Sequence, residues 1–208
     1  MSPQTFLDTA AMYALFRVAD DIVDSTHGTA ESKAFELERF MSNFWTCLKK
    51  GKGQFEMHPI LPAVIETCVR LKYRRELFER FFKSMVADTN NEGNICEGLS
   101  DTLEYIDGSA AVIGEFMAHI LLASEENKEI ERLLPRARHL GQAFQLTNMI
   151  RDIGEDLDMN RQYVPLEICR EHNVNLRDRD VSSPGFPDLM EHMFDIADDM
   201  YVGEVETM

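Results

Sequence analysis

The 208-residue sequence is poor in residues that build loops, disulfide frameworks or nucleic-acid-binding surfaces. Only 11 glycines and 7 prolines are present, too few for a loop-dominated or low-complexity chain. The four cysteines form no CxxC pair, so there is no zinc signature or disulfide framework, and reduced thiols in a cytoplasmic compartment are expected. Lys and Arg number 21 against 37 Asp and Glu, giving a formal net charge of −16. Because phosphate repels such a chain, we expect no nucleic-acid partner.

Long apolar runs are also missing. The longest, residues 110–123, is interrupted by Glu115 and His119, so it does not predict a bilayer span. Charged residues interrupt the first 21 residues, which excludes a secretory signal. The six histidines show no pair at the spacing of helical metal ligands.

Apolar residues recur at helical spacing along nearly the whole chain, and no convincing alternating strand is present. Turn residues predict loops at 88–94 and 182–187. We therefore expect an all-α fold, a single helical domain over residues 1–208 whose helices pack around a shared interior. The predicted helices cover about 4–25, 31–49, 59–71, 74–88, 100–123, 126–158 and 186–203.

Two of the predicted helices carry polar stripes with similar spacing. The first stripe consists of Tyr13, Arg17, Asp20 and Asp24, at offsets 0, 4, 7 and 11; the second consists of Gln145, Asn148, Asp152 and Asp156, at offsets 0, 3, 7 and 11. Each set lies on one side of an α-helix. The other sides are apolar, so both helices are expected to be largely buried, with their carboxylates shielded from bulk water.

Burying several ionised carboxylates is unfavourable unless cations neutralise them. Arg17 and Arg151 are too few to do so. Oxygen ligands without paired His or Cys favour Mg²⁺, with Mn²⁺ as the alternative, over zinc. The stripes therefore predict a helical cavity with two facing acidic rims, in which metal bridges a diphosphate. A single such motif would more simply be a solvated face or a frayed helix end, but two on apolar helices are harder to explain in that way.

The motifs resemble those of the squalene/phytoene synthase family. The resemblance rests on Tyr13-Ala-Leu-Phe-Arg-Val-Ala-Asp-Asp-Ile-Val-Asp24, on Tyr105-Ile-Asp-Gly-Ser-Ala-Ala-Val-Ile-Gly114, and on the run from Leu140 through Gln145, Asn148, Arg151, Asp152 and Asp156 to Tyr163-Val-Pro165. It covers nearly the whole chain, and it implies an isoprenoid-synthase-type helical bundle around a central cavity.

The resemblance also implies a reaction, the head-to-head joining of two allylic diphosphates through a cyclopropyl diphosphate intermediate. It implies metal binding by Asp20, Asp21, Asp24, Asn148, Asp152 and Asp156, and diphosphate binding by Tyr13, Arg17, Tyr105, Gln145 and Arg151. The residues expected to take part in catalysis are Asp20, Asp24, Asp152, Asp156, Tyr105 and Arg151. The small residues of 108–114 would leave room for a prenyl chain, unless they serve only close helix packing.

The motif Gly-Ser-Ala-Ala-Val-Ile-Gly and Tyr163-Val-Pro165 look most like phytoene synthases, which join two geranylgeranyl diphosphates in carotenoid synthesis. A squalene or dehydrosqualene synthase using farnesyl diphosphate is the alternative. A chain-elongating synthase is disfavoured because the second motif reads N-x-x-x-D-x-x-x-D rather than a second DDxxD. A reading of another class is a non-catalytic helical assembly or binding protein, or an inactive fragment.

Compared with the family pattern, the chain begins late and stops early. We expect that it lacks the family's N-terminal segment and C-terminal helices, which would leave the bundle incomplete. Because an upstream segment is expected, a plastid location stays open beside the cytoplasmic one. The lipid-like substrates imply loose peripheral membrane association, although no basic amphipathic helix marks it. The sequence does not indicate an oligomeric state.

Overall fold

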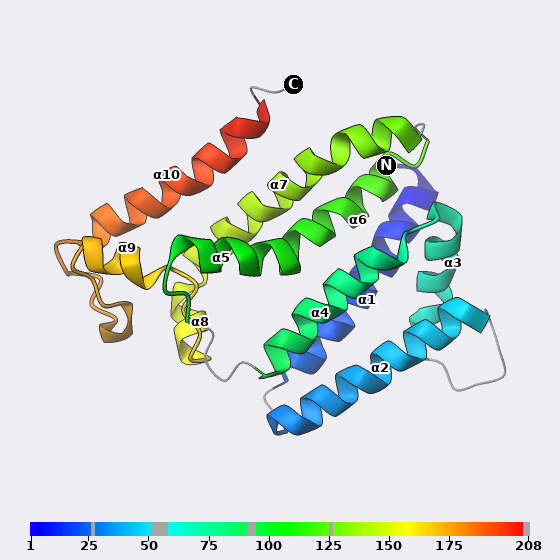
Figure 1. Cartoon of the computed structure of the whole chain (residues 1–208), viewed down its shortest axis with the longest axis horizontal. Helices are drawn as coiled ribbons and strands as arrows, with labels where there is room; N and C mark the ends of the chain where they lie inside the picture. Colours follow the sequence, from blue (N-terminus) through cyan, green and yellow to red (C-terminus); the bar gives the residue numbers. More distant parts are fainter. Residues whose placement is uncertain (26–27, 51–57, 91–94, 125–126, 206–208) are drawn as a thin grey trace. The chain divides into compact units, whose positions relative to one another are not determined.

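The computed structural model describes residues 1–25, 28–50, 58–90, 95–124 and 127–205, and Figure 1 shows it as a set of helices. Over these residues no strand forms, and the one extended pairing is an isolated bridge between Ile95 and Gln162. The all-α prediction is therefore confirmed.

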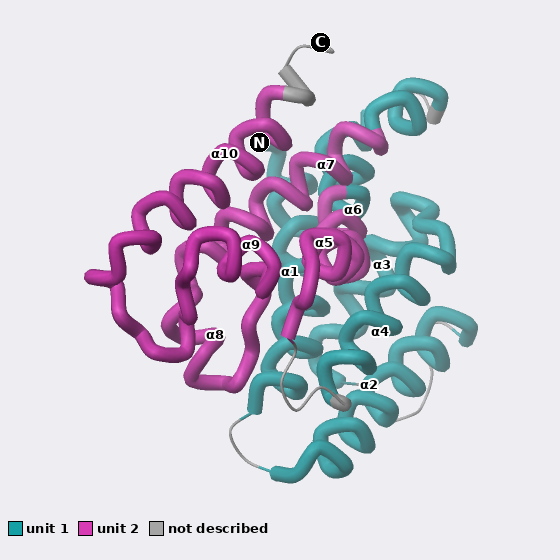
Figure 2. Tube along the Cα trace, turned by 60° about the vertical axis from the view of Figure 1, so that its left-hand side comes forward, with its two compact units in different colours: residues 1–90, 115–133 teal, residues 91–114, 134–208 magenta. Residues whose placement is uncertain are grey.

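The chain divides into two compact units, which Figure 2 shows in different colours. Unit 1 consists of Met1–Asn90 with Glu115–Leu133, and unit 2 consists of Asn91–Gly114 with Leu134–Met208. We predicted a single domain over residues 1–208, which would include both units, and this stays a prediction.

Within its described residues, unit 1 contains four complete helices and parts of two more. They are α1 (Pro3–Val23), α2 (Ala30–Lys50), α3 (Leu61–Leu71), α4 (Arg75–Asn90), most of α6 (Val112–Leu121) and the start of α7 (Asn127–Arg151). α1 contacts α2, α3 and α4, and α2 runs beside α4 (Figure 1). Ser2 caps α1, because its hydroxyl accepts a hydrogen bond from the Thr5 N–H at 3.0 Å and Pro3 takes the first helical position, where no N–H is needed.

The core of unit 1 is largely aromatic. The ring of Phe16 on α1 packs against Phe81 at 5.0 Å and Phe116 at 5.2 Å between centroids. Phe44 and Phe78, at 4.8 Å, continue the cluster. Each such side chain contributes about 1.5–3 kcal/mol on burial, so this cluster is a main source of the stability of unit 1.

Two buried carboxylates cross-link the helices of unit 1. Asp8 on α1 is 2% exposed, forms an ion pair with Arg70 of α3 and accepts a hydrogen bond from the Thr67 hydroxyl at 3.1 Å. Glu115 on α6 is also buried and lies 2.7 Å from Arg80 of α4. Because each carboxylate has a cationic partner, its burial is compensated.

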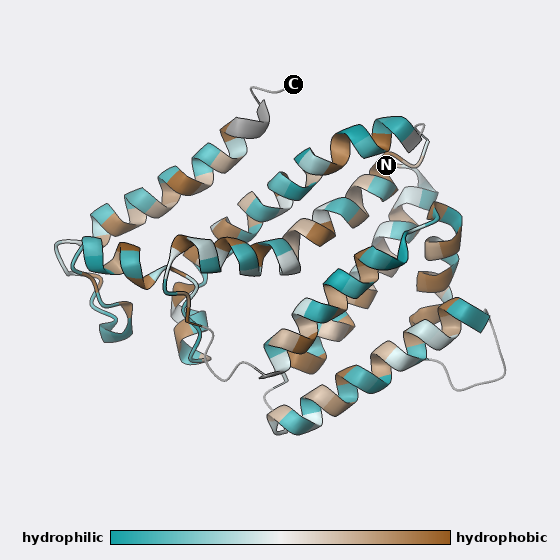
Figure 3. Ribbon diagram, in the orientation of Figure 1, coloured by the Kyte–Doolittle hydropathy of each residue, from teal (hydrophilic) through white to brown (hydrophobic). Residues whose placement is uncertain are grey.

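Unit 2 contains shorter elements around a second apolar core. They are α5 (Leu99–Ile106), the π-helical turn η1 (Asp107–Ala111), the remainder of α6 and α7, α8 (Ile153–Asp158), α9 (Leu166–Glu171), the 3₁₀ turn η2 (Leu176–Asp178) and α10 (Phe186–Val205). Along α10, Leu189, Met193 and Ala197 are buried at intervals of four residues, and many of the other positions of the helix are hydrophilic (Figure 3). This is the amphipathic pattern that predicted the helix.

The structure corrects the predicted secondary structure at four places. The predicted helix 126–158 is broken at Asp152, whose φ of −98° and ψ of 13° lie outside the α-helical values. The predicted helix 100–123 contains the π-helical turn at 107–111. Residues 166–171, left without an element, form α9, which is too short for apolar periodicity to reveal. In the predicted loop at 88–94, α4 continues to Asn90 and residues 91–94 lie outside the described part of the chain.

Candidate functional site

The C-terminal end of α1 brings two carboxylates together. Asp24 caps the helix, and its N–H donates to the Asp20 carbonyl oxygen at 2.7 Å, so the two side chains lie one turn apart on the same face. Asp20 is half-buried, and its pKa is raised to about 6, first by burial and then by the negative charge of Asp24, while Arg17 acts in the opposite direction. Anionic oxygens held in this way favour the binding of a cation.

The other residues of the first stripe lie at the surface. Tyr13 is 65% exposed, and Arg17 and Asp24 are exposed as well. The expectation that the whole stripe is shielded from water is therefore wrong for this structure. The reason is that α1 buries a single side, which includes Met12, Leu15 and Ala19.

Asp21 lies on a different face of α1 from Asp20 and Asp24. Its carboxylate forms an ion pair with Arg17 at 2.9 Å. With Val18 it lines a cavity of about 590 Å³ within unit 1, and His58 lies in the wall of the same cavity. The predicted role of Asp21 as a metal ligand therefore rests on its position in the motif and stays a prediction.

The second stripe, in unit 2, keeps its register across the break between α7 and α8. The Asp152 N–H donates to the Asn148 carbonyl at 2.8 Å, and the Asp156 N–H donates to the Asp152 carbonyl at 2.9 Å. These four-residue steps hold Asn148, Asp152 and Asp156 on one side of the chain, each with a half-buried side chain. Gln145, one turn earlier on α7, is half-buried too. The prediction that these residues share one side of the chain is therefore confirmed although the helix is interrupted, and their role as metal ligands stays a prediction.

Arg151 and Asp152 form a bidentate pair. The guanidinium donates from Nε to Oδ1 and from Nη2 to Oδ2, both at 2.6 Å, and the pKa of Asp152 is lowered by this hydrogen bonding. Asp152 is therefore ionised at neutral pH, as a metal ligand must be. Arg151 is exposed, so its guanidinium is accessible to a ligand. Its predicted contact with diphosphate would use the same group that now pairs with Asp152.

Tyr105 on α5 is oriented by a second tyrosine that the sequence interpretation left without a role. The rings of Tyr105 and Tyr163 stack at 4.7 Å with 29° between their planes, and the Tyr163 hydroxyl donates to that of Tyr105 at 3.1 Å. Tyr163 is itself fixed, because its carbonyl accepts the Thr102 hydroxyl at 2.7 Å. The spacing of residues within a motif could not reveal this pair, because 58 residues separate its members.

The small residues that follow Tyr105 serve close packing within unit 2. A Cβ added to Gly114 would lie 2.0 Å from the Ala137 carbonyl oxygen, and one added to Gly141 would lie 2.6 Å from the Ala110 oxygen. These glycines let α6 and η1 approach the backbone of α7. The packing explanation of the run 108–114 is therefore supported at Gly114, and space for a prenyl chain beside the run stays a prediction.

An ion pair at the π-helical turn was also missed from the sequence. Asp107 accepts hydrogen bonds from Arg138 at 2.5 Å and from Gln142 at 3.3 Å. Both donors lie on α7, four residues apart, and this spacing was the available signal. This network fixes the π-helical turn, which carries one of the motifs described above. Such turns are frequent at functional sites.

Two expectations from composition can be compared directly with the structure. All four cysteines lie in the described residues, are buried and are free thiols, which confirms the absence of disulfides. Among the described helices, none has the length and apolar character needed to cross a bilayer.

The residues of both stripes fit a magnesium-type ion. Asp20 and Asp24 in unit 1, and Asn148, Asp152 and Asp156 in unit 2, offer oxygen donors only. Burial, and then the charge of Asp24, raises the pKa of Asp20, and a bound cation would oppose both effects. Hard divalent cations prefer such donors.

Comparison with known proteins shows clear relatives. The sequence model of the family described as squalene/phytoene synthase matches residues 3–205. A phytoene synthase of Thermus thermophilus is 31% identical over 190 residues, which are 88% of this chain and 58% of that protein. A presqualene diphosphate synthase of Rhodopseudomonas palustris is 29% identical over 168 residues, or 80% of this chain and 56% of that protein. The chain thus spans a little over half the length of these relatives.

The fold has solved counterparts as well. The crystal structure of a dehydrosqualene synthase in complex with ligand matches 99% of this chain and 68% of its own, with a TM-score of 0.78 and 22% identity. The expected isoprenoid-synthase-type helical fold is thereby confirmed.

Proposed function

The chain belongs to the squalene/phytoene synthase family, and from this premise we propose that it catalyses the head-to-head condensation of two allylic prenyl diphosphates. The substrates are two geranylgeranyl diphosphates, and the product is phytoene, formed through a cyclopropyl diphosphate intermediate. The observation that carries the proposal is the family match over residues 3–205, which contains both carboxylate stripes. The 31% identity to a phytoene synthase favours this product.

The carboxylates are proposed to hold Mg²⁺, or Mn²⁺ in its place. Asp20 and Asp24 form one set of ligands, with Asp21 as a further candidate, and Asn148, Asp152 and Asp156 form the other. When bound, the metal stabilises the negative charge that develops on a departing diphosphate. Asp152 meets the requirement of an ionised ligand through its pairing with Arg151.

The remaining motif residues are proposed to bind and orient diphosphate. Arg17 and Arg151 supply guanidinium groups, which match phosphate oxygens in geometry and charge. Gln145 and Tyr13 add polar contacts. Both arginines are exposed and already paired with neighbouring carboxylates, so diphosphate binding would exchange one anionic partner for another.

Tyr105 is proposed to act near the reacting carbons. Its ring is held by stacking on Tyr163, and its hydroxyl oxygen accepts the hydrogen bond from Tyr163, which fixes the direction of the group. Preorganised dipoles of this kind stabilise developing charge without a cost of reorientation.

A second candidate is condensation of two farnesyl diphosphates, because one relative is named a presqualene diphosphate synthase at 29% identity. The test is incubation of the 208-residue chain and Mg²⁺ with labelled geranylgeranyl or farnesyl diphosphate, followed by extraction and identification of the hydrocarbon. Phytoene from the first substrate is the expected result. Product from farnesyl diphosphate alone would assign the second function, and no condensed product from either would overturn the enzymatic proposal in favour of a non-catalytic helical protein.

The same assay tests the residues. Asp20→Asn and Asp152→Asn are expected to lower turnover by at least about 100-fold, the scale of losing one preorganised electrostatic contact. Asp199→Asn removes an exposed carboxylate of α10 and is the matched control, with turnover unchanged. Equal turnover in all three variants would exclude the two stripes from the reaction.

A further inference from the structure

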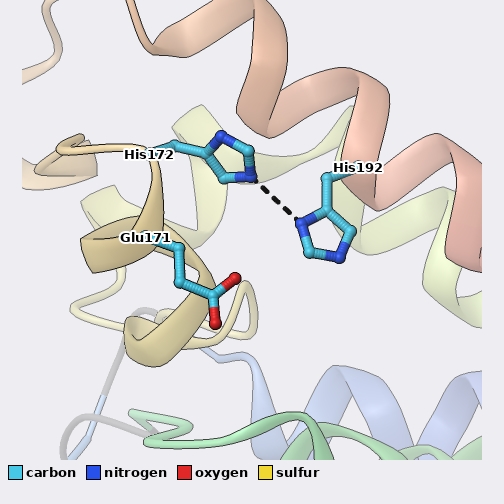
Figure 4. Close-up of side chains that lie close together, drawn as sticks. All are labelled: Glu171, His172 and His192. Atoms are coloured by element: carbon cyan, nitrogen blue, oxygen red, sulfur yellow. Dashed lines mark hydrogen bonds between the residues drawn. The ribbon is translucent and has the colours of Figure 1, made fainter.

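Three side chains of unit 2 that play no part in the proposed reaction converge on one point. Glu171, His172 and His192 each present one ligand atom, and these atoms lie within 4.8 Å of one another. Glu171 is the last residue of α9, His172 caps that helix, and His192 lies on α10 (Figure 4). The Nε2 atom of His172 is 3.0 Å from the Nδ1 atom of His192.

The packed core of unit 2 positions the two histidines. Cys169 on α9, three residues before His172, and Met193 on α10, directly after His192, both belong to this core and are almost fully buried. At the start of α10, a Cβ added to Gly185 would lie 1.9 Å from the His172 carbonyl oxygen, so only glycine permits this approach. The ring positions are therefore set by the surrounding backbone as well as by their own hydrogen bond.

The separation of the two histidine nitrogens is close to that of two ligands in a transition-metal site. With Zn–N bonds of about 2.0–2.1 Å and tetrahedral angles, two ligating nitrogens lie roughly 3.3 Å apart. The observed separation of 3.0 Å needs only a few tenths of an ångström of adjustment. The outer ring nitrogens, His172 Nδ1 and His192 Nε2, point away from each other, so they can carry the protons while the inner pair binds (Figure 4).

From this arrangement we propose that Glu171, His172 and His192 bind one Zn²⁺ ion, with water completing the coordination. Two imidazole nitrogens and one carboxylate oxygen are the ligand set of open zinc sites. Nitrogen donors distinguish the site chemically from the oxygen-only stripes, which suit magnesium. Binding would link the end of α9 to α10 across 20 residues of chain, and it would stabilise unit 2 by linkage.

The alternative use of the pair is a direct hydrogen bond, in which one imidazole N–H donates to the other ring. A metal at the inner atoms replaces that proton, which moves to the outer nitrogen of the same ring, and both imidazoles stay neutral. The exposed carboxylates of Asp188, Glu191 and Asp195 on α10 add negative charge beside His192, which favours the cation.

The test is a titration of the 208-residue chain with Co²⁺, a spectroscopic substitute for Zn²⁺, in the presence of excess Mg²⁺ to occupy oxygen-only sites. We expect one equivalent of Co²⁺ with ligand-field absorption typical of a nitrogen-containing tetrahedral site, displaced by Zn²⁺. Loss of an outer-shell partner lowers metal affinity about 10–100-fold, so loss of a ligand in Glu171→Gln or His192→Ala should lower it by at least about 100-fold.

Asp199→Asn is the matched control, because it removes an exposed carboxylate of the same helix, seven residues from His192, without touching the three ligands, and its affinity should equal that of the wild type. Glu171 is exposed, so Glu171→Gln stays informative even if His192→Ala does not fold. Absence of the absorption in the wild-type chain, or equal affinity in Glu171→Gln and wild type, would overturn the site and leave the histidine pair as a hydrogen bond. Neither result depends on prenyl transfer, which has its own assay.

Discussion

Replacing Asp20 by Asn should stabilise the metal-free chain at neutral pH while it weakens the response to Mg²⁺. The side chain is half-buried at the end of α1, and burial and the charge of Asp24 together raise its pKa from 3.8 to about 6. An asparagine at this position has a similar shape and no charge to desolvate. The variant therefore separates the stability lost by burying the carboxylate from its proposed role in binding Mg²⁺.

The magnitude follows from linkage. Below pH 3.8 the Asp20 carboxyl is protonated in the folded and the unfolded chain; as the pH rises toward 6 the unfolded chain releases its proton first, so stability is lost across this window. At about 1.36 kcal/mol for each pKa unit, the rise of the pKa from 3.8 to about 6 lowers the free energy of unfolding by ~3 kcal/mol above pH 6. Solvent screening of a half-exposed group reduces this to about 1–2 kcal/mol.

The assay is urea denaturation of wild type and Asp20→Asn in chelator, at about pH 5 and about pH 7.5. The variant should be more stable at the higher pH, and its advantage should shrink at the lower one. Glu38→Gln, an exposed carboxylate of α2, is the control and should change little at either pH. Added Mg²⁺ should raise the melting temperature of wild type more than that of Asp20→Asn, which keeps only the second set of proposed ligands. A variant less stable than wild type at pH 7.5, or a difference independent of pH, would refute the reasoning.

Three further predictions concern the packing. Gly114→Ala should destabilise the chain by about 1–3 kcal/mol in denaturant titrations, because its Cβ would meet the Ala137 carbonyl, and unchanged stability would contradict that contact. Thr102→Val should cost about 1–3 kcal/mol by leaving the Tyr163 carbonyl without its hydroxyl donor, whereas Thr102→Ser should recover most of it. Burial raises the pKa of the Cys68 thiol to about 12, so thiol reagents should modify it in the unfolded chain far faster than in the native one; equal rates would show that it is accessible.

The long helices follow from the sequence because their signal is local. α1 and α10 begin and end within a few residues of the predicted 4–25 and 186–203, since each has apolar residues at helical spacing. The acidic stripes were found for the same reason, because residues four apart on a helix share a face. The break at Asp152 was not predicted, since nothing in its neighbours' polarity marks a change of backbone angles.

What the sequence alone determined is therefore the all-α class, the family and the order of the polar stripe residues along α1, α7 and α8, all of which depend on neighbours within a few turns. The tertiary structure alone decided which distant side chains meet: Tyr105 with Tyr163, and His172 with His192. Those pairs are separated by 58 and 20 residues, and the path between them turns through short helices and loops. Their proximity comes from how the buried side chains of unit 2 pack, and a periodicity read over a few helical turns carries no information about that.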